Sequence, residues 1–310
     1  MIHPPPDHEE ALRQLWTECC AAGPKTKLPN TNKYDYHHHL FYHGRNKEET
    51  LAYLYYTQPD YETFMRWLAE YPPDFKAIYK HEDRILSDED LARWHRDGYI
   101  VVKGVVPRSQ CEAACAAIWE YINATPDEPA TWYRDHPGKN GMMLRLVHHP
   151  ALDANRSSSR IRKVFEELYG HDQLYQPIDK VSFNAPESGT HRFTGSALHW
   201  DVSIAPPIPY SAQGLLYLTD TTAEDGAFNC VPGFHRIATE WLSATETGIN
   251  PRDRAIKELK PIHVPGNAGD MVIWLQALPH CATPNKGAMP RMVQYISWRP
   301  QNIKEAEVWL

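Results

Sequence analysis

The sequence predicts a mixed, mainly β fold, in which a β-barrel or β-sandwich is buttressed by helices and preceded by a helical extension. From about residue 180 onward, short apolar segments alternate with turn residues, which is typical of a barrel or sandwich. Helical patterns with clear start and stop signals occupy the preceding part. The chain has 310 residues, 42% of them hydrophobic, which is enough to bury a large core.

The first 85 residues are predicted to form a helical extension packed on the core. Two stretches, Glu48–Tyr56 and Tyr61–Tyr71, carry aromatic and aliphatic residues at steps of three and four. Each helix is therefore expected to bury one face. Pro59 separates the two stretches, and Pro72 follows the second. We predict two units, residues 1–85 and residues 86–310.

The second unit is predicted to begin helix, strand, helix. Ser87 and Asp90 resemble a capping box that starts a short helix, and Gly98 ends it. A β-branched strand, Tyr99–Val102, follows, and Pro107 starts another helix. Further strands are predicted at Lys180–Asn184, Gly214–Thr219, Ala227–Val231, Met271–Leu275 and Met292–Trp298.

Composition narrows the class of protein. The net charge is -7 and no dense run of Lys and Arg occurs, which argues against nucleic acid as a partner. No apolar stretch approaches the roughly 18 residues of a membrane helix, and the start lacks the basic and apolar segments of a secretory signal. We therefore expect a cytoplasmic protein without a membrane partner. The six cysteines form no disulfide framework and are interpreted as buried thiols.

Three His-x-Asp triplets occur, and with 17 histidines in the chain the motif alone is weak. His95 and Asp97 lie in a predicted helix, where residues two apart point in different directions. The triplet at His81 lies in a polar segment interpreted as a surface loop. Only His199-Trp200-Asp201 lies in an extended, apolar stretch, where both side chains point to one side. His199 and Asp201 can therefore share a metal ion, as in sites with two histidines and one carboxylate.

His280 is the best candidate for the second histidine ligand. It follows a turn and the apolar strand Met271–Leu275, in a segment too apolar for a simply solvated imidazole. The alternative is a histidine buried in the core with its hydrogen bonds made by neighbouring groups. A further histidine-rich segment, His37–His39 with His43, lacks a carboxylate in register. We interpret that segment as polar surface and predict no metal there.

Arg291, eleven residues beyond His280, opens a predicted strand. A guanidinium at the inner end of a strand needs a carboxylate partner, because burying a lone charge is costly. Either a bound dicarboxylate such as 2-oxoglutarate or a protein Asp or Glu would supply that partner.

Residues 86–310 resemble the phytanoyl-CoA dioxygenase family of Fe(II)- and 2-oxoglutarate-dependent oxygenases. The resemblance rests on five features: Leu86–Glu89 with Asp97–Val102, the His199-x-Asp201 triplet, Glu224–Phe228, the Pro-Gly-x-His turn in Val231–His235, and Gly269-Asp270 followed by His280 and Arg291. It implies a double-stranded β-helix, a cupin-like jelly-roll barrel. It also implies that His199, Asp201 and His280 bind Fe(II) and are catalytic, that Arg291 binds 2-oxoglutarate, and that His235 is a structural turn residue.

Two features concern the remaining cosubstrate contacts. Arg291 is followed by Met292-Val293, so the Arg-x-Ser arrangement of some related oxygenases is missing. Lys180, Ser182 and Asn184 alternate with apolar residues, so Asn184 or Lys180 could reach 2-oxoglutarate from the barrel interior. An equally good interpretation is a strand whose polar side chains face solvent.

The resemblance implies a dioxygenase that uses Fe(II), 2-oxoglutarate and O2. We expect it to hydroxylate an unactivated C–H bond of a small metabolite, an amino acid derivative or natural-product intermediate, with release of succinate and CO2. Asp201 stands where related halogenases carry a small residue, which disfavours halogenation. Trp200 and the segments 185–196 and 205–210 are expected at the mouth of the site. The alternatives are an inactive cupin-like binding protein and, less favoured, a zinc hydrolase.

Overall fold

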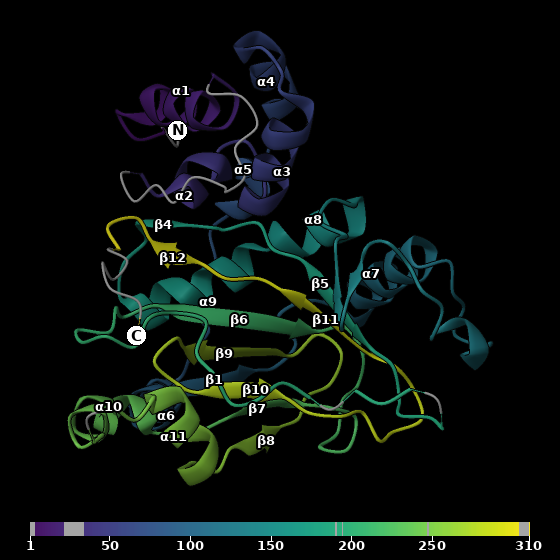
Figure 1. The fold of residues 1–310 in the computed structure, drawn as a ribbon, viewed down its shortest axis with the longest axis vertical. Coiled ribbons are helices and arrows are strands. Elements are labelled where there is room, and N and C mark those ends of the chain that lie inside the picture. The colour runs from purple at the N-terminus through teal and green to yellow at the C-terminus, as the bar shows by residue number, and fades with distance from the viewer. Residues whose placement is uncertain (1–3, 22–33, 190, 194, 247, 304–309) are drawn as a thin grey trace.

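The computed structural model describes residues 4–21, 34–189, 191–193, 195–246, 248–303 and 310. A large antiparallel sheet packs against a smaller one (Figure 1). In spatial order, the large sheet contains β1 (Tyr99–Val102), β9 (Met271–Leu275), β6 (Ala212–Tyr217), β11 (Arg291–Tyr295), β5 (Val181–Asn184), β3 (Met143–Leu144) and β2 (Lys139–Asn140). The small sheet contains β10 (His280–Ala282), β7 (Phe228–Cys230) and β8 (Ile262–Val264), and β12 (Arg299–Pro300) pairs with β4 (Leu174–Tyr175).

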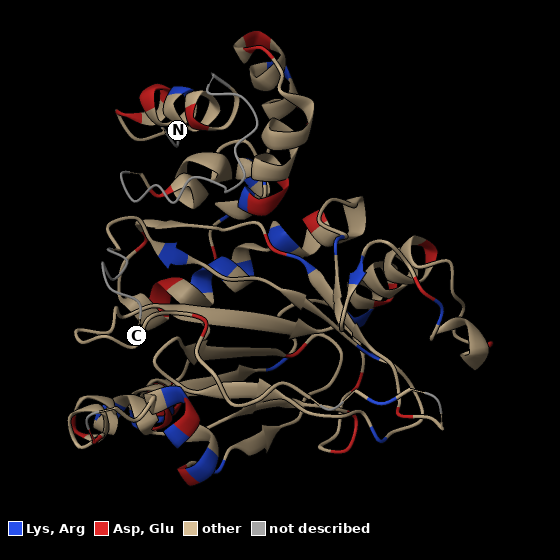
Figure 2. Cartoon of the chain, viewed as in Figure 1, with Lys and Arg blue, Asp and Glu red and all other residues tan. Residues whose placement is uncertain are grey.

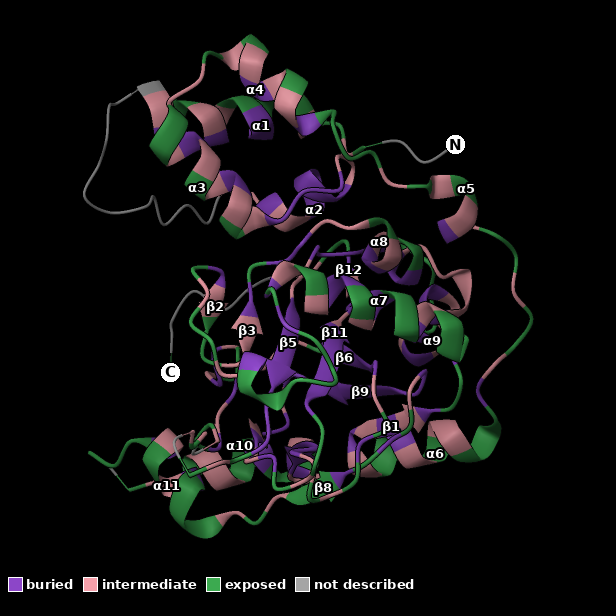
Figure 3. Cartoon of the chain, turned by 90° about the vertical axis from the view of Figure 1, so that its right-hand side faces the viewer, coloured by how far each residue is buried: buried purple, intermediate pink, exposed green. Residues whose placement is uncertain are grey.

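The two sheets enclose the interior of the barrel. Phe228 of β7 and Trp274 of β9 meet across it, with ring centroids 4.3 Å apart. The central strands are almost entirely buried, and the helices around them expose one side to solvent (Figure 3). This mainly antiparallel, helix-buttressed arrangement confirms the predicted double-stranded β-helix.

Helices surround the sheets and contribute to the same apolar core. They are α6 (Asp88–Asp97), α7 (Arg108–Tyr121), the short 3-10 turn η2 (Pro129–Thr131), α8 (Pro150–Arg156), α9 (Ser159–Tyr169), α10 (Phe234–Ser243) and α11 (Pro251–Glu258). Among the described residues, none of the helices is long and apolar enough to cross a membrane.

The predicted start of α6 is confirmed in detail. The Ser87 hydroxyl accepts from the Asp90 amide, and the Asp90 carboxylate accepts from the Ser87 amide, which is a reciprocal capping box. Gly98 ends the helix with φ of 76°, and a Cβ there would lie 2.5 Å from Nδ1 of His235. His235 therefore packs against this turn, and its Nε2 lies 3.2 Å from the His95 carbonyl oxygen.

The amino-terminal helices form a group at one end of the molecule (Figure 1). They are α1 (His8–Trp16) with the π-helical turn η1 (Thr17–Ala21), α2 (Tyr36–Phe41), α3 (Lys47–Thr57), α4 (Tyr61–Leu68) and α5 (Phe75–Ile78). Helices α3 and α4 correspond to the two predicted ones. Leu12, Leu54 and Phe64 belong to an apolar cluster separate from the main core. A hydrogen bond from the Asn46 amide to the Ile178 carbonyl links α3 to the barrel.

The interpretation of His37–His39 and His43 as polar surface was wrong. Residues 36–41 form helix α2, with His38 and His39 buried. His8 of α1 lies between two of these imidazoles: its Nδ1 is 3.3 Å from Nδ1 of His39, and its Nε2 is 3.1 Å from Nε2 of His43. Burial, followed by the nearby His8, lowers the pKa of both His39 and His43 to about 4. The cluster is therefore neutral at pH 7.

This histidine cluster predicts acid sensitivity of the helical extension. The pKa values of His39 and His43 are lower in the folded chain than the ordinary 6.5, so the stability they contribute is present above pH 6.5 and is lost as the pH falls toward 4. We expect the free energy of unfolding, measured by denaturant titration, to decrease over this range. The His39→Gln/His43→Gln double variant should show a weaker decrease, and His81→Gln in the exposed loop should not differ from wild type. An unaltered pH profile in the double variant would contradict this account.

Candidate metal centre

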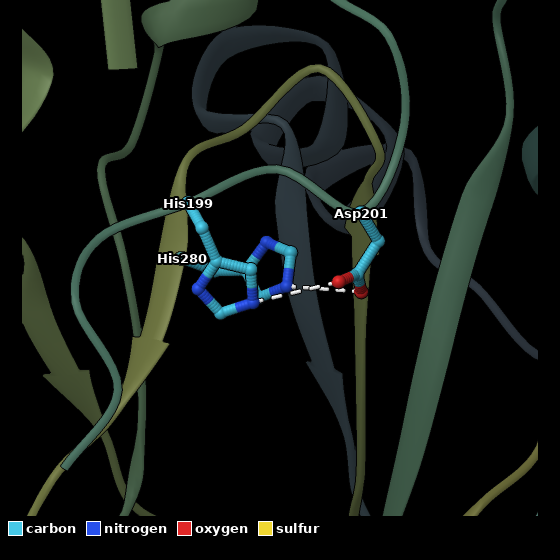
Figure 4. Close-up of side chains that lie close together, drawn as sticks. All are labelled: His199, Asp201 and His280. Carbon is cyan, nitrogen blue, oxygen red and sulfur yellow. Dashed lines mark hydrogen bonds and ion pairs between the residues drawn. The ribbon is translucent and has the colours of Figure 1, made fainter. Parts of the chain in front are cut away.

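Two backbone hydrogen bonds bring the two histidines together. The His199 amide donates to the His280 carbonyl and the His280 amide donates to the His199 carbonyl, each at 2.9 Å. In an antiparallel pair, residues directly opposite each other project to the same side, and the two ring centroids lie 4.6 Å apart. Asp201 follows two residues later, and its carboxylate faces both rings (Figure 4). One ligand atom from each residue lies within 4.8 Å of the others.

The ring nitrogens of both histidines have defined roles. Nδ1 of His199 lies 2.8 Å from the Ala197 carbonyl oxygen, and Nδ1 of His280 lies 3.2 Å from that of Leu278. Because a carbonyl only accepts, each Nδ1 donates. The Nε2 atoms face Asp201, at 3.4 Å for His199 and 3.3 Å for His280. Hydrogen bonds of this kind orient imidazoles that bind metals through Nε2.

The electrostatics favour a bound cation. Burial tends to raise the pKa of Asp201, but the hydrogen bonds from His199 and His280 outweigh it and hold the pKa well below its usual range. The hydrogen bond that His199 makes to Asp201 raises the pKa of the His199 imidazole. His280 is buried, whereas the Asp201 side chain is 45% exposed, so one side of the cluster is open. Two imidazoles and one carboxylate with an open side fit mononuclear Fe(II), and the same donors also fit zinc.

Neighbouring groups hold the Asp201 segment in place. Nε2 of Gln213, on β6, donates to Oδ2 of Asp201 at 2.8 Å. Nε1 of Trp200 donates to the Ala277 carbonyl at 2.9 Å. The Arg252 guanidinium donates to the carbonyls of Trp200 and Val202, both at 2.9 Å. Arg252 therefore clamps the backbone on both sides of Asp201.

The cluster opens into a cavity of about 340 Å3 between the two sheets. We call this space the barrel cavity. Its lining residues are Met142, Met143, Asp179, Ser196, His199, Asp201, Gln213, Leu215, Phe228, Trp274, His280, Cys281, Ala282, Arg291 and Tyr295.

Arg291 reaches the barrel cavity from the start of β11 and is 2% exposed. Its Nη1 donates to the Gly226 carbonyl at 2.7 Å, and its Nη2 to the Ser182 hydroxyl at 3.2 Å. Within the described ranges, no Asp or Glu lies within ion-pair distance of Arg291. The protein carboxylate that was one alternative for this charge is therefore not found there.

The polar residues of β5 have different environments. Ser182 lies directly opposite Val293, so its hydroxyl stands beside Arg291 although Arg-x-Ser is missing from β11. Asn184 pairs with Arg291 in the strand register, and its amide donates to the Thr283 carbonyl at 3.2 Å. Neither the Asn184 side chain nor Lys180 lines the barrel cavity.

The placement of Lys180 differs from the predicted one. Its amine forms an ion pair with Glu48 of α3. It lines a separate cavity of about 610 Å3, together with residues of α3 and with Arg145 and Val147. Strand β5 begins only at Val181, so the alternation that would have turned Lys180 inward does not extend to it.

The predicted mouth residues also differ in part. Of these, Ser196 lines the barrel cavity, whereas Trp200 is buried. Tyr210 accepts a hydrogen bond from Trp94 of α6 and lies away from the cavity lining, as does the rest of segment 205–210. The sequence reasoning missed Asp179, Gln213 and Tyr295. Tyr295 stands four residues after Arg291, and period-two alternation on β11 could have indicated it.

A double-stranded β-helix with two histidines and a carboxylate at its cavity defines a cupin-like protein with a candidate mononuclear metal centre. Residues 94–293 match the family described as Phytanoyl-CoA dioxygenase (PhyH). The chain belongs to this family, as its motifs predicted.

Individual relatives agree with this assignment. A Dictyostelium discoideum protein named "Putative phytanoyl-CoA dioxygenase" is 22% identical over 265 residues, covering 67% of this chain and 74% of that protein. Among solved structures, the non-heme alpha ketoglutarate dependent carbocyclase SnoK from nogalamycin biosynthesis gives a TM-score of 0.53 at 22% identity, over 70% of this chain and 85% of its own. AviO1 from Streptomyces viridochromogenes Tue57 gives a TM-score of 0.53 at 15% identity, and the match covers 73% of this chain and 100% of AviO1. These likenesses establish the fold.

The clamp on Asp201 predicts a role for Arg252 in metal binding. Arg252→Met removes the donors to the Trp200 and Val202 carbonyls, so Asp201 should lose its fixed position. Changes in groups that support metal ligands typically weaken affinity by about 10- to 100-fold. Titration of the metal-free protein with Co(II), followed by its visible absorption, should detect a weakening of at least about tenfold. Lys257→Met, at an exposed position of the same helix, should bind as wild type does. Equal affinities in the two variants would contradict the clamp.

Proposed function

We propose that this chain is a non-haem Fe(II)- and 2-oxoglutarate-dependent dioxygenase that hydroxylates a small molecule. His199, Asp201 and His280 would hold the iron through Nε2, a carboxylate oxygen and Nε2. Arg291, assisted by Ser182, would hold the distal carboxylate of 2-oxoglutarate. When bound, iron, 2-oxoglutarate and O2 would supply the oxidising chemistry, with succinate and CO2 as products.

The observation that carries this proposal is the uncompensated Arg291 guanidinium in the barrel cavity. A buried cation without a carboxylate destabilises a fold unless a ligand provides one. A guanidinium also binds a carboxylate through two parallel hydrogen bonds. A zinc hydrolase would use the same three ligands but would leave Arg291 without a role, so we favour the oxygenase.

The chain's own residues have three tasks in this reaction. His199 and His280 would bind the metal through Nε2, because each Nδ1 is held by a hydrogen bond to a backbone carbonyl and each Nε2 faces the shared centre. Asp201 occupies a ligand position in its ionised form, which disfavours halogenation and favours hydroxylation. Leu215, Phe228 and Trp274 give the cavity apolar walls that limit water around the reacting groups.

We also propose a division of labour along the chain. Residues 86–310 would form the oxygenase unit. Residues 1–85 would support it from the β5 side, through the Glu48–Lys180 ion pair and the hydrogen bond from Asn46. In this proposal Lys180 has a structural role, and Asn184 supports the loop after β10.

The test is an anaerobic titration of the metal-free protein with Fe(II) and then 2-oxoglutarate. We expect the weak visible charge-transfer band of the chelated complex in wild type, and no band in His199→Ala or His280→Ala, because a metal ligand is missing. In Arg291→Gln the band should require at least about tenfold more 2-oxoglutarate, since a buried charge partner is lost. Arg108→Gln, which breaks an exposed ion pair with Asp220, is the matched control. A normal band in His280→Ala, or an unaltered 2-oxoglutarate requirement in Arg291→Gln, would contradict the assignment.

A further inference from the structure

The carboxylate of Asp179 also lines the barrel cavity. Oδ1 of Asp179 accepts a hydrogen bond from the Lys180 amide at 2.7 Å. In the part of the chain that the structure describes, no Lys, Arg or His nitrogen lies within ion-pair distance of this carboxylate. The hydrogen bond does not require a charge, because the side-chain oxygen of an asparagine could accept it equally well. Among the described residues, the negative charge of Asp179 therefore forms no direct ion pair.

The two nearest cations are engaged elsewhere. The Lys180 amine pairs with Glu48 of α3. Arg156 binds the Asp153 carboxylate through Nη1, and through Nη2 it binds the backbone carbonyls of Val147 and Asp179. Burial raises the pKa of Asp179 and outweighs the hydrogen bond from the Lys180 amide and the charges on Lys180 and Arg156, which lower it. An ionised carboxylate here consequently carries a desolvation cost that a bound cation would offset.

Asp179 and Arg291 stand at opposite ends of the β5–β11 pair. Arg291 lies opposite Asn184, the last residue of β5, whereas Asp179 precedes Lys180, whose carbonyl accepts from the Tyr295 amide. Four residues of strand, from Arg291 to Tyr295, span roughly 13 Å. This is the backbone separation of the two ends, and no ion pair joins the two side chains among the described residues. A carboxylate would complement Arg291, and a cation would complement Asp179.

We propose that Asp179 binds a positively charged group of the substrate, an ammonium or a guanidinium. This inference rests on the proposed function, in which the carboxylate at Arg291 belongs to 2-oxoglutarate. The substrate class is then a small amine or guanidine. Tyr295, which also lines the cavity, is the hydrogen-bonding neighbour of this cation. A site of this kind rejects neutral analogues, because they leave the half-buried carboxylate without an ion-pair partner.

The test compares matched cationic and neutral probes by isothermal titration calorimetry under nitrogen, on protein loaded with Fe(II) and 2-oxoglutarate. The pairs are butylamine with 1-butanol and butylguanidine with butylurea. We expect wild type to prefer the cation of each pair by at least about tenfold. Asp179→Asn should remove this preference, Asp179→Glu should retain it, and Asp83→Asn, which removes a charge from an exposed loop, should not alter it.

Thermal unfolding without a probe gives an independent readout. Asp179→Asn removes a half-buried charge that forms no ion pair while keeping the acceptor for the Lys180 amide, so its Tm should be higher than that of wild type at pH 7. A structural role for the charge would lower the Tm instead. Equal binding of cationic and neutral probes by wild type, or an unaltered preference in Asp179→Asn, would overturn the inference.

The two proposals fail in distinguishable ways. If wild type forms the visible 2-oxoglutarate band but shows no preference for cations, the substrate class is wrong and the proposed function stands. If the band is missing in folded, iron-loaded protein, the proposed function fails, and the substrate role of Asp179 fails with it.

Discussion

The backbone pairing of His199 with His280 is the interaction on which the candidate site depends. It joins two segments that lie far apart in the sequence and sets two imidazoles side by side at the edge of the barrel. Asp201 follows two residues later, at a bend, and its carboxylate faces the same two rings. Every other feature of the centre acts on this arrangement: carbonyls orient the rings, and Gln213 and Arg252 hold Asp201. The geometry thus follows from strand pairing and needs few additional contacts.

The distribution of charge in the barrel links fold to function. Arg291 is the only charged residue in β5, β6, β9 and β11, and charged residues lie mostly on helices and loops (Figure 2). An apolar interior makes any buried charge expensive. A guanidinium and a carboxylate that remain unpaired in one cavity therefore indicate ligands. In our proposals, 2-oxoglutarate pairs with the Arg291 guanidinium, and a cationic substrate pairs with the Asp179 carboxylate.

Local sequence patterns predicted much of the fold, because capping boxes, proline and glycine signals and strand periodicity act over a few residues. The extended stretch predicted around His199 is observed only in part, because the backbone bends at Asp201 and Val202. Tertiary contacts could not be predicted in this way. The contacts of His8 with His39 and His43 join residues more than thirty positions apart. Lys180 lies before the first residue of β5 and pairs with Glu48 of a distant helix. Asp179 could not be predicted as a site residue, because its lack of an ion-pair partner is seen only in the structure.

The most direct test of the central claim is a crystal structure of the protein grown without oxygen, with Mn(II) in place of iron and 2-oxoglutarate present. The account predicts an anomalous peak bound to His199, Asp201 and His280, with the distal carboxylate of 2-oxoglutarate on the Arg291 guanidinium. A metal bound at other residues, or a 2-oxoglutarate carboxylate that leaves Arg291 unpaired, would contradict it.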